Sequence, residues 1–319
     1  MHASERRQYE NCIYSPHSKN RLSQTFFTIY YNFLYNILRM LHHRNGKNNI
    51  KVISRLEVSQ LLKKNIHLSL CRFGDGELGI AFTQHTIGFQ EYSHTLSVRL
   101  QGILKSPQMD NMLVCIPDVF NGLEEMRPAS ADFWKQWYVM FHSIIENNIC
   151  KEYLYGDTNI SRIYLPWRNR KYESQIVDNI RSVWTDKCLV ICEGDKTRFG
   201  VGNTLINNAT IVKRIICPSE NAWDKYELIL KKCLDISSED CVFVLALGPT
   251  ATVLAWDLAK YGLRALDLGH LDLQFEYMVR TYSCKKLIPN KYNNEVAGGR
   301  IVSECDDESY VNSIIARIS

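Results

Sequence analysis

Short apolar runs alternate with helical patterns along most of this chain, and this alternation most constrains its fold. The runs lie at 66–73, 111–118, 187–195, 211–218, 241–248 and 263–269. Most are apolar throughout, not at every second position, as in strands that are covered on both faces. Between them, 221–235 has apolar residues near the 3.6 period, and 248–262 has proline early and glycine last, as helices do. The pattern predicts an α/β fold, a mostly parallel sheet with helices on both faces.

Composition narrows the class of protein. With 319 residues, 45% of them apolar and 23% charged, the chain is expected to be a soluble globular protein with a real core. The net charge is only +4 and no run of five like charges occurs, so we expect no nucleic-acid partner. None of the 11 cysteines has CxxC zinc spacing, and Cys188 and Cys192 fall in an apolar run. We therefore expect reduced, buried thiols in a cytoplasmic protein.

The N-terminal 50 residues differ from the rest. Residues 25–41 are rich in aromatic side chains and flanked by arginines, but polar residues interrupt them and 17 residues is marginal for a membrane span. We expect an amphipathic helix that either packs on the main domain or lies peripherally at the inner face of a membrane, or contacts a partner enzyme. Polar residues 43–50 mark a boundary, which gives an N-terminal helical extension (1–50) and a main domain with a C-terminal tail (51–319). Residues 307–319 are expected to form a short terminal helix.

Polar residues follow several predicted strands at their carboxyl ends, where open α/β sheets bind ligands. They are Asp75 and Glu77 after the first, Glu193, Asp195, Lys196 and Arg198 after the third, and Asp267, His270 and Asp272 after the last. We expect them to converge at one edge of the sheet.

The stretch LCRFGDGELGIAF places Asp75 and Glu77 among three glycines. In an extended segment, residues i and i+2 point the same way, so both carboxylates could bind one Mg²⁺ or Mn²⁺. Gly74 and Gly76 would leave room for a phosphate. The alternative is an Asp-Gly turn with Glu77 as an acid in the first turn of a helix.

Two further stretches could contribute to chemistry. EGDKTRFGVGN, residues 193–203, combines a strand end with glycines and cations and suits a phosphate-binding loop, or is a glycine-rich connection with solvated charges. In DLGHLDLQFEY, residues 267–277, a helix from Leu271 would place Asp272 and Glu276 on one face, where either could take a proton from a hydroxyl. His270 could assist there or have a core or capping role.

Four motifs in order, RFGDGELGI, CPSENAWDKY, ALGPTATVLAWDLAKYG and DLGHLDLQFEY, resemble the bacterial GT-D type glycosyltransferase family, formerly a domain of unknown function. The resemblance runs from about residue 52 to the end and includes NKYNNEVAGG. It implies a Rossmann-like fold, a UDP-sugar donor and a divalent metal, Mn²⁺ or Mg²⁺, held by a D-x-E motif. Here that motif is Asp75-Gly76-Glu77, so the resemblance favours metal ligation over a simple turn.

The implied activity is transfer of a hexose, with glucose expected, from a UDP-sugar to a hydroxyl of a glycan or glycoprotein in surface glycan assembly. Asp75 and Glu77 are then the metal ligands. The expected donor-binding residues are Arg72, Gly74, Gly76, Glu193, Arg198, Gly200, Gly202, Asn203, Pro249 and Thr250. The expected catalytic residues are Asp272, Glu276 and His270, with Glu295 and Asp195 as alternative bases.

Two other functions remain open at the level of sequence. An S-adenosylmethionine-dependent methyltransferase also places glycine and an acid after its first strand, but its acids bind cofactor hydroxyls and need no metal. A non-catalytic glycan-binding or scaffold subunit would use the N-terminal helix to contact partners.

Overall fold

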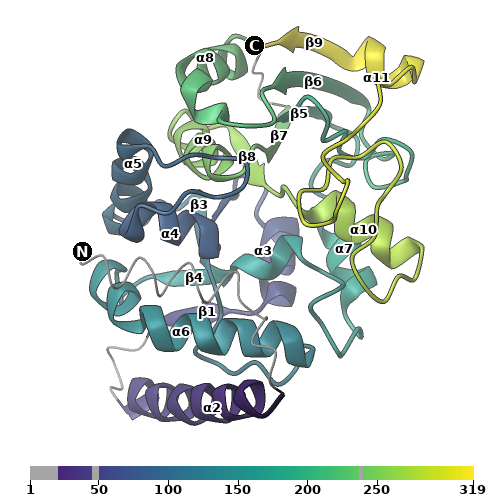
Figure 1. The fold of residues 1–319 in the computed structure, drawn as a ribbon. Helices are drawn as coiled ribbons and strands as arrows, with labels where there is room; N and C mark the ends of the chain where they lie inside the picture. Colours follow the sequence, from purple (N-terminus) through teal and green to yellow (C-terminus); the bar gives the residue numbers. More distant parts are fainter. Residues whose placement is uncertain (1–20, 45–49, 237–239) are drawn as a thin grey trace.

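A computed structural model describes residues 21–44, 50–236 and 240–319 of the chain (Figure 1). Its centre is a nine-stranded sheet in the order β1-β4-β3-β2-β8-β7-β5-β6-β9, and every registered pairing is parallel. The strands are β1 Lys51–Ile53, β2 Ser69–Arg72, β3 Met112–Ile116, β4 Leu154–Asp157, β5 Cys188–Gly194, β6 Ile211–Cys217, β7 Cys241–Ala246, β8 Arg264–Asp267 and β9 Ile314–Arg317. The predicted parallel sheet and its six predicted strands are confirmed.

Helices cover both faces of this sheet (Figure 1). They are α2 Arg21–Arg44, α3 Arg55–Lys64, α4 Asp75–Thr83, α5 His94–Lys105, α6 Pro128–Asn148, α7 Glu173–Arg181, α8 Tyr226–Asp235, α9 Pro249–Lys260, α10 Leu271–Val279 and α11 Glu308–Ser313. One apolar cluster joins the sheet to α5, α6, α8 and α9, and a second joins it to α3, α7 and α10. In β7, Phe243 and Leu245 belong to the first cluster, whereas Val242 and Val244 belong to the second. Burial on both faces explains why the strands are apolar throughout.

The terminal helix predicted over 307–319 is only half correct. Helix α11 ends at Ser313, and the next residues form β9, which pairs with β6 at the edge of the sheet. Ile314 and Ile315 are β-branched and favour a strand over a helix. The composition of this segment therefore changes from helix-compatible to strand-forming within a few residues.

The predicted N-terminal helix is present as α2, and it packs against α6. Tyr35 of α2 is buried, and its hydroxyl donates a hydrogen bond to the Val119 carbonyl oxygen at 2.9 Å. The predicted boundary near residue 50 falls between α2 and β1, next to residues 45–49, which lie outside the described ranges. Among the helices described, none combines the length and apolar character needed to cross a membrane.

The two halves of the chain meet at the centre of the sheet. Strands β1 to β4 form one side and β5 to β9 the other, and the halves join where Leu70 of β2 pairs with Leu266 of β8. The carboxyl ends of β2 and β8 therefore lie next to each other. Ligands of open α/β sheets bind at such an edge, which makes it the first place to look for a functional site.

Candidate active site

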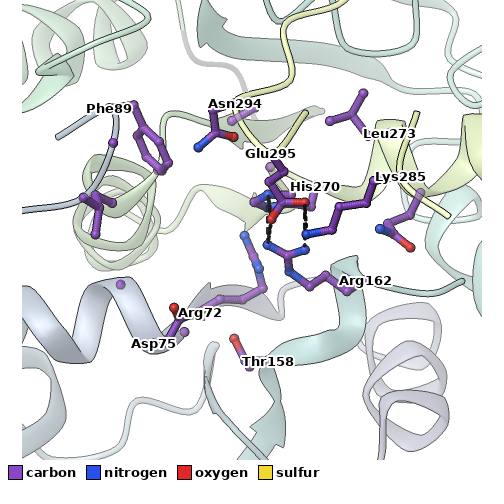
Figure 2. Close-up of a pocket in the computed structure, with 18 of the residues that line it drawn as sticks. Arg72, Asp75, Phe89, Thr158, Arg162, His270, Leu273, Lys285, Asn294 and Glu295 are labelled. Atoms are coloured by element: carbon purple, nitrogen blue, oxygen red, sulfur yellow. Dashed lines mark hydrogen bonds and ion pairs between the residues drawn. The ribbon is translucent and has the colours of Figure 1, made fainter. Parts of the chain in front are cut away.

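A cavity of about 890 Å³ lies at this edge. Its lining comes from the residues after β2, β4, β7 and β8, from the start of α6 and from the loop before residue 296. Of the residues predicted as metal ligands, donor-binding residues or first-choice bases, seven line it: Arg72, Gly74, Asp75, Gly76, Glu77, His270 and Asp272. Of the two alternative bases, Glu295 lines it and Asp195 does not. Figure 2 shows Asp75 and Arg72 after β2, with the Arg72 side chain extending toward the group formed by His270, Glu295 and Arg162.

The D-x-E residues lie in a helix, not in an extended stretch. Helix α4 begins at Asp75, and Glu77 Oε2 accepts a hydrogen bond from the Gly74 N–H at 2.8 Å. The expectation of two parallel carboxylates is therefore corrected, because residues i and i+2 of a helix point in different directions. The alternative, Glu77 as a first-turn acid that satisfies the helix N-terminus, describes its conformation.

Both acids occupy a poorly solvated position. Burial raises the pKa of Asp75, and the positive charge of Arg162 opposes that rise. Burial also raises the pKa of Glu77 to about 7, and the negative charge of Asp267 adds to the effect. Carboxylates with little solvent are stabilised by a cation, so this wall of the cavity is suited to a positively charged group.

Arg72 is fixed by the end of the neighbouring strand. Its Nε donates to the Asp267 carbonyl oxygen at 2.7 Å and its Nη2 to Asp267 Oδ1 at 2.7 Å. Asp267 is buried at the end of β8, so the pair joins the two halves of the sheet at the cavity. A guanidinium held this way presents fixed donors toward an anion.

A second group of charged side chains, Arg162, Lys285 and Glu295, also lines the cavity (Figure 2). Arg162 Nη2 donates to Glu295 Oε1 at 2.7 Å, and Lys285 Nζ lies 3.0 Å from Glu295 Oε2. The positive charge of Arg162 holds the pKa of Glu295 well below its usual value, although burial alone would raise it. Glu295 is therefore an anion that positions two cations.

His270 is part of the same group. Its Nε2 lies 3.1 Å from Arg162 Nη2, and a guanidinium only donates, so this nitrogen accepts and the proton of the neutral ring is placed on Nδ1. Burial, reinforced by the charge of Arg162, lowers the pKa of His270 to about 4. The imidazole is neutral near pH 7.

Aromatic side chains form part of the cavity lining. Phe89 lies beside Gly248, which has φ +55° and where a Cβ would overlap the Phe89 ring. Only glycine is compatible with both that backbone and that contact. Phe133 and Trp134 from α6 add further aromatic surface to the lining. Aromatic surface of this kind suits a base or a sugar ring.

Asp272 and Glu276 share one face of α10, as predicted, but they form a buried network. Asn203 Nδ2 donates to Asp272 Oδ1 at 2.7 Å and to Glu276 Oε1 at 2.8 Å. Lys291 Nζ lies 2.5 Å from Asp272 Oδ2. Asp272 reaches the cavity lining and Glu276 does not. This network joins the 200–203 loop and the 291 segment to α10, which gives both acids a structural task.

Most of the predicted phosphate loop lies beneath the cavity. Glu193 is fully buried and pairs with Arg214 at 2.5 Å, and Arg198 donates to the Asn290 carbonyl oxygen at 3.0 Å. Of residues 193–203, only Gly194 and Thr197 are part of the lining. The predicted donor-binding residues that the structure does not bring to the lining are Glu193, Arg198, Gly200, Gly202, Asn203, Pro249 and Thr250. Four of them hold the surrounding loops instead: Glu193 pairs with Arg214, Arg198 donates to the Asn290 carbonyl oxygen, and Gly200 and Asn203 donate to Asp272.

Sequence reasoning missed the residues that follow β4. Thr158, Asn159 and Arg162 line the cavity directly after this strand. β4 has four residues, and the short run YLYGD did not attract a strand prediction. The polar residues Asp157, which ends that run, and Thr158 and Asn159, which follow it, were the signal that could have identified it.

The donor set suits a divalent cation that is shared with a ligand. The described residues contain no cluster of three or more His, Cys, Asp or Glu that could hold a metal by itself. Asp75 and Glu77 both line the cavity, and one Glu77 oxygen is already bonded to Gly74. Mg²⁺ and similar cations often use one or two carboxylates and complete their shell with phosphate oxygens and water, so these two acids fit such an ion.

The chain is similar to several known proteins. It is 35% identical over 271 residues to "Probable glycosyl transferase Gly" of Streptococcus gordonii, covering 84% of this chain and 39% of that protein. It is 31% identical over 250 residues to "Glycosyltransferase GlyD" of Streptococcus pneumoniae, covering 78% of this chain and 30% of that protein. The chain thus corresponds to less than half of the length of either relative.

Solved structures match over more of their length. A structure described as a new glycosyltransferase, domain of unknown function 1792, from Streptococcus sanguinis is 33% identical with a TM-score of 0.80. The match covers 85% of this chain and 100% of that one. Another, described as domain of unknown function 1792 with a distinct glycosyltransferase fold, is also 33% identical with a TM-score of 0.80, over 88% of this chain and all of the other.

The family model for the glycosyltransferase GT-D fold matches residues 70–296, which include the residues after β2, β4 and β8 and Glu295. This match spans more than half of the chain, and with these relatives it establishes that the chain belongs to the GT-D fold glycosyltransferase family.

Proposed function

We propose that this chain transfers a hexose, with glucose as the expected sugar, from a UDP-sugar to a hydroxyl of a glycan or glycoprotein acceptor. In the reaction the bond between the sugar C1 and the diphosphate oxygen breaks, a bond from C1 to the acceptor oxygen forms, and the hydroxyl proton passes to a base. The observation that best supports this proposal is the convergence of Asp75, Arg72 and Arg162 on one cavity. The two guanidinium groups, together with a cation held by Asp75, would balance the negative charge of a diphosphate.

The two arginines have the role of binding the leaving group. Each guanidinium is held by a carboxylate from another segment, Arg72 by Asp267 and Arg162 by Glu295. Donors that are fixed in advance need no reorganisation when charge develops on the departing UDP, so they stabilise the transition state. Lys285, on the far side of Glu295, adds a further positive charge to the same wall.

Asp75 and Glu77 have the role of holding Mn²⁺ or Mg²⁺. When bound, such a cation neutralises negative charge on the diphosphate as the sugar leaves. Asp75 is the main ligand in this proposal, because one oxygen of Glu77 accepts a hydrogen bond from Gly74. Glu77 has a second role as the acid that satisfies the N-terminus of α4.

Family membership favours this function over the two rivals. A methyltransferase would need no metal, and a purely structural subunit would need neither the acids nor the paired arginines. The acceptor base stays a prediction among Asp272, Glu276 and His270, and the buried ion pair of Asp272 with Lys291 weighs against Asp272.

Ligand-dependent thermal stability tests the proposal. A ligand at a hundred times its Kd stabilises the native state by about 2.7 kcal/mol. UDP with Mn²⁺ should raise the unfolding midpoint by several degrees, whereas UDP in EDTA should raise it less and S-adenosylmethionine not at all. A panel of UDP- and GDP-sugars, assayed for donor hydrolysis, then identifies the nucleotide and the sugar.

Variants make the test specific. Asp75→Asn should remove the Mn²⁺-dependent part of the shift, while Asp178→Asn, at an exposed position of α7, should leave it unchanged. Stabilisation by S-adenosylmethionine without any response to UDP and Mn²⁺ would overturn the proposal.

A further inference from the structure

Helix α2 has two apolar faces, and within the described part of the chain one of them is covered and the other is exposed. On the inner face, Tyr35 and His42 are buried and Leu38 packs against the main core. Lys135 of α6 donates to Asn32 Oδ1 of α2 at 2.7 Å. The inner face thus attaches α2 firmly to the domain, and Figure 1 shows α2 at the lower edge of the molecule, below α6.

The outer face exposes large apolar side chains. Phe26 is 68% exposed, Ile29 62% and Phe33 63%, and Met40 continues the row at 52%. The spacing of these residues by three, four and seven places them on one side of the helix, opposite Tyr35. Of the 18 large hydrophobic residues that are exposed in the described part of the chain, seven lie on α2. They are Phe26, Phe27, Ile29, Tyr30, Phe33, Met40 and Leu41.

The charge of this part of the chain is also distinctive. Helix α2 contains no Asp or Glu. Residues 1–50 contain seven Lys or Arg and two Glu, a formal charge of +5, whereas the whole chain has +4. Residues 51–319 therefore have −1, so the excess positive charge of the sequence lies in the N-terminal segment that contains α2. Within α2, Arg39 pairs with Glu124 at 2.9 Å and Arg44 is exposed.

This combination identifies the partner by its chemistry. An apolar row with aromatic residues, on a helix without acids and in a segment of sequence rich in cations, is complementary to a lipid surface with anionic headgroups. A second copy of the same face would bring two positive segments together, which is unfavourable. We propose that α2 binds an anionic membrane surface, with Phe26, Ile29, Phe33 and Met40 inserted between the headgroups and the helix parallel to the bilayer.

Binding of α2 to a membrane would also place part of the cavity near the lipid surface. Lys135, which contacts α2, directly follows Phe133 and Trp134, and those two residues line the cavity. A membrane-bound α2 would therefore hold the α6 end of the cavity near the lipid surface. The proposal itself does not depend on the donor or on the reaction, so it can fail or succeed independently of the proposed function.

Co-sedimentation of the 319-residue chain with vesicles tests the proposal. The chain should sediment with vesicles of 30% phosphatidylglycerol in phosphatidylcholine, and binding should fall at least tenfold with pure phosphatidylcholine. The double variant Phe26→Gln/Phe33→Gln should also bind at least tenfold more weakly. The matched control is Ile211→Gln/Leu228→Gln, which removes two apolar side chains exposed elsewhere, and it should bind like the wild type.

Three results would overturn the proposal: no binding to the anionic vesicles, equal loss in the two double variants, or equal binding to neutral vesicles. A fourth is a dimer in light scattering that Phe26→Gln/Phe33→Gln dissociates while vesicle binding is absent, because the face would then join two copies. The thermal midpoint of each variant should match that of the wild type, since the four side chains are exposed.

Discussion

Replacing Asp272 by Asn should weaken the fold more than it weakens catalysis. The carboxylate is buried and lies 2.5 Å from Lys291, and it accepts hydrogen bonds from Gly200 and Asn203 at 3.0 and 2.7 Å. Removing one partner of a buried ion pair costs about 3 to 5 kcal/mol, because the other charge stays buried without compensation. Lys291 keeps Glu276 Oε1 at 3.5 Å, so we expect the lower end of that range.

This cost converts into a measurable shift of the unfolding midpoint. An unfolding entropy of about 2.1 cal/mol/K per residue gives roughly 0.7 kcal/mol/K for 319 residues. A loss of about 3 kcal/mol should then lower the midpoint by about 4 to 5 °C. Turnover of the folded variant at 25 °C should stay within about tenfold of the wild type, since hydrogen bonds from Asn can replace part of the network.

Differential scanning fluorimetry and donor-sugar turnover, measured on the same preparations, check this prediction. Lys291→Met is the matched partner variant, and it should lower the midpoint by a similar amount. The double variant Asp272→Asn/Lys291→Met should cost clearly less than the sum of the two single changes, because the pair is lost only once. A midpoint equal to that of the wild type, with turnover reduced a hundredfold and UDP affinity unchanged, would refute the reasoning and identify Asp272 as the acceptor base.

The other site residues give predictions of different kinds. Asp75→Asn and Glu77→Gln should each lower turnover about a hundredfold or more, because each removes a negative ligand from a hard cation; UDP titration with and without Mn²⁺ checks this. Glu77→Gln should in addition lower the thermal midpoint, since Glu77 accepts from the backbone at the start of α4. Arg162→Gln should weaken UDP binding at least tenfold in calorimetry. An unchanged UDP affinity would show that Arg162 neutralises Glu295 and does not bind the nucleotide. The folded pKa of His270 lies near 4, below its unfolded value, so this residue contributes a loss of stability as the pH falls from about 6.5 to 4. The free energy of unfolding of His270→Gln should fall less steeply than that of the wild type across that pH range. An equal dependence on pH in the two proteins would contradict the lowered pKa.

The sequence predicted the fold well where strands are long and buried. β5, β6 and β7 have six or seven residues each, so their apolar runs stand out from the surrounding helices. β1 and β4 have three and four residues, too few for a periodic signal, whereas β2 and β8, with four residues each, stood out because their apolar runs extend beyond the strands. β1 and β4 are strands because β3 already offers an unpaired edge to β4, and β4 in turn offers one to β1. Such context is tertiary and is not encoded in the short segments themselves.

The candidate site was predictable only in part, for a related reason. Arg72 and Asp75 directly follow a recognisable strand, so the position of the strand predicted theirs. The 193–203 loop follows an equally clear strand, but Glu193 and Arg198 point to Arg214 and to the 290 segment and not to the cavity. Glycines and cations in a loop suggest phosphate binding, yet the direction of each side chain depends on partners far away in the sequence. A motif therefore locates a loop more reliably than it assigns the contacts within it.

The role of Glu295 follows from the charges around it. Arg162 and Lys285 lie within 3.0 Å of its two oxygens, and the charge of Arg162 lowers its pKa well below the usual value. A carboxylate with so low a pKa is a weak base, so Glu295 is a poor candidate to accept a proton from the acceptor. Glu295 instead neutralises and orients Arg162, because a poorly solvated guanidinium needs a counter-charge to remain fixed in one orientation. Asp267 does the same for Arg72 from the end of β8. The two carboxylates thus keep two cations charged and oriented at the edge where the halves of the sheet meet, which is the arrangement that a diphosphate leaving group requires.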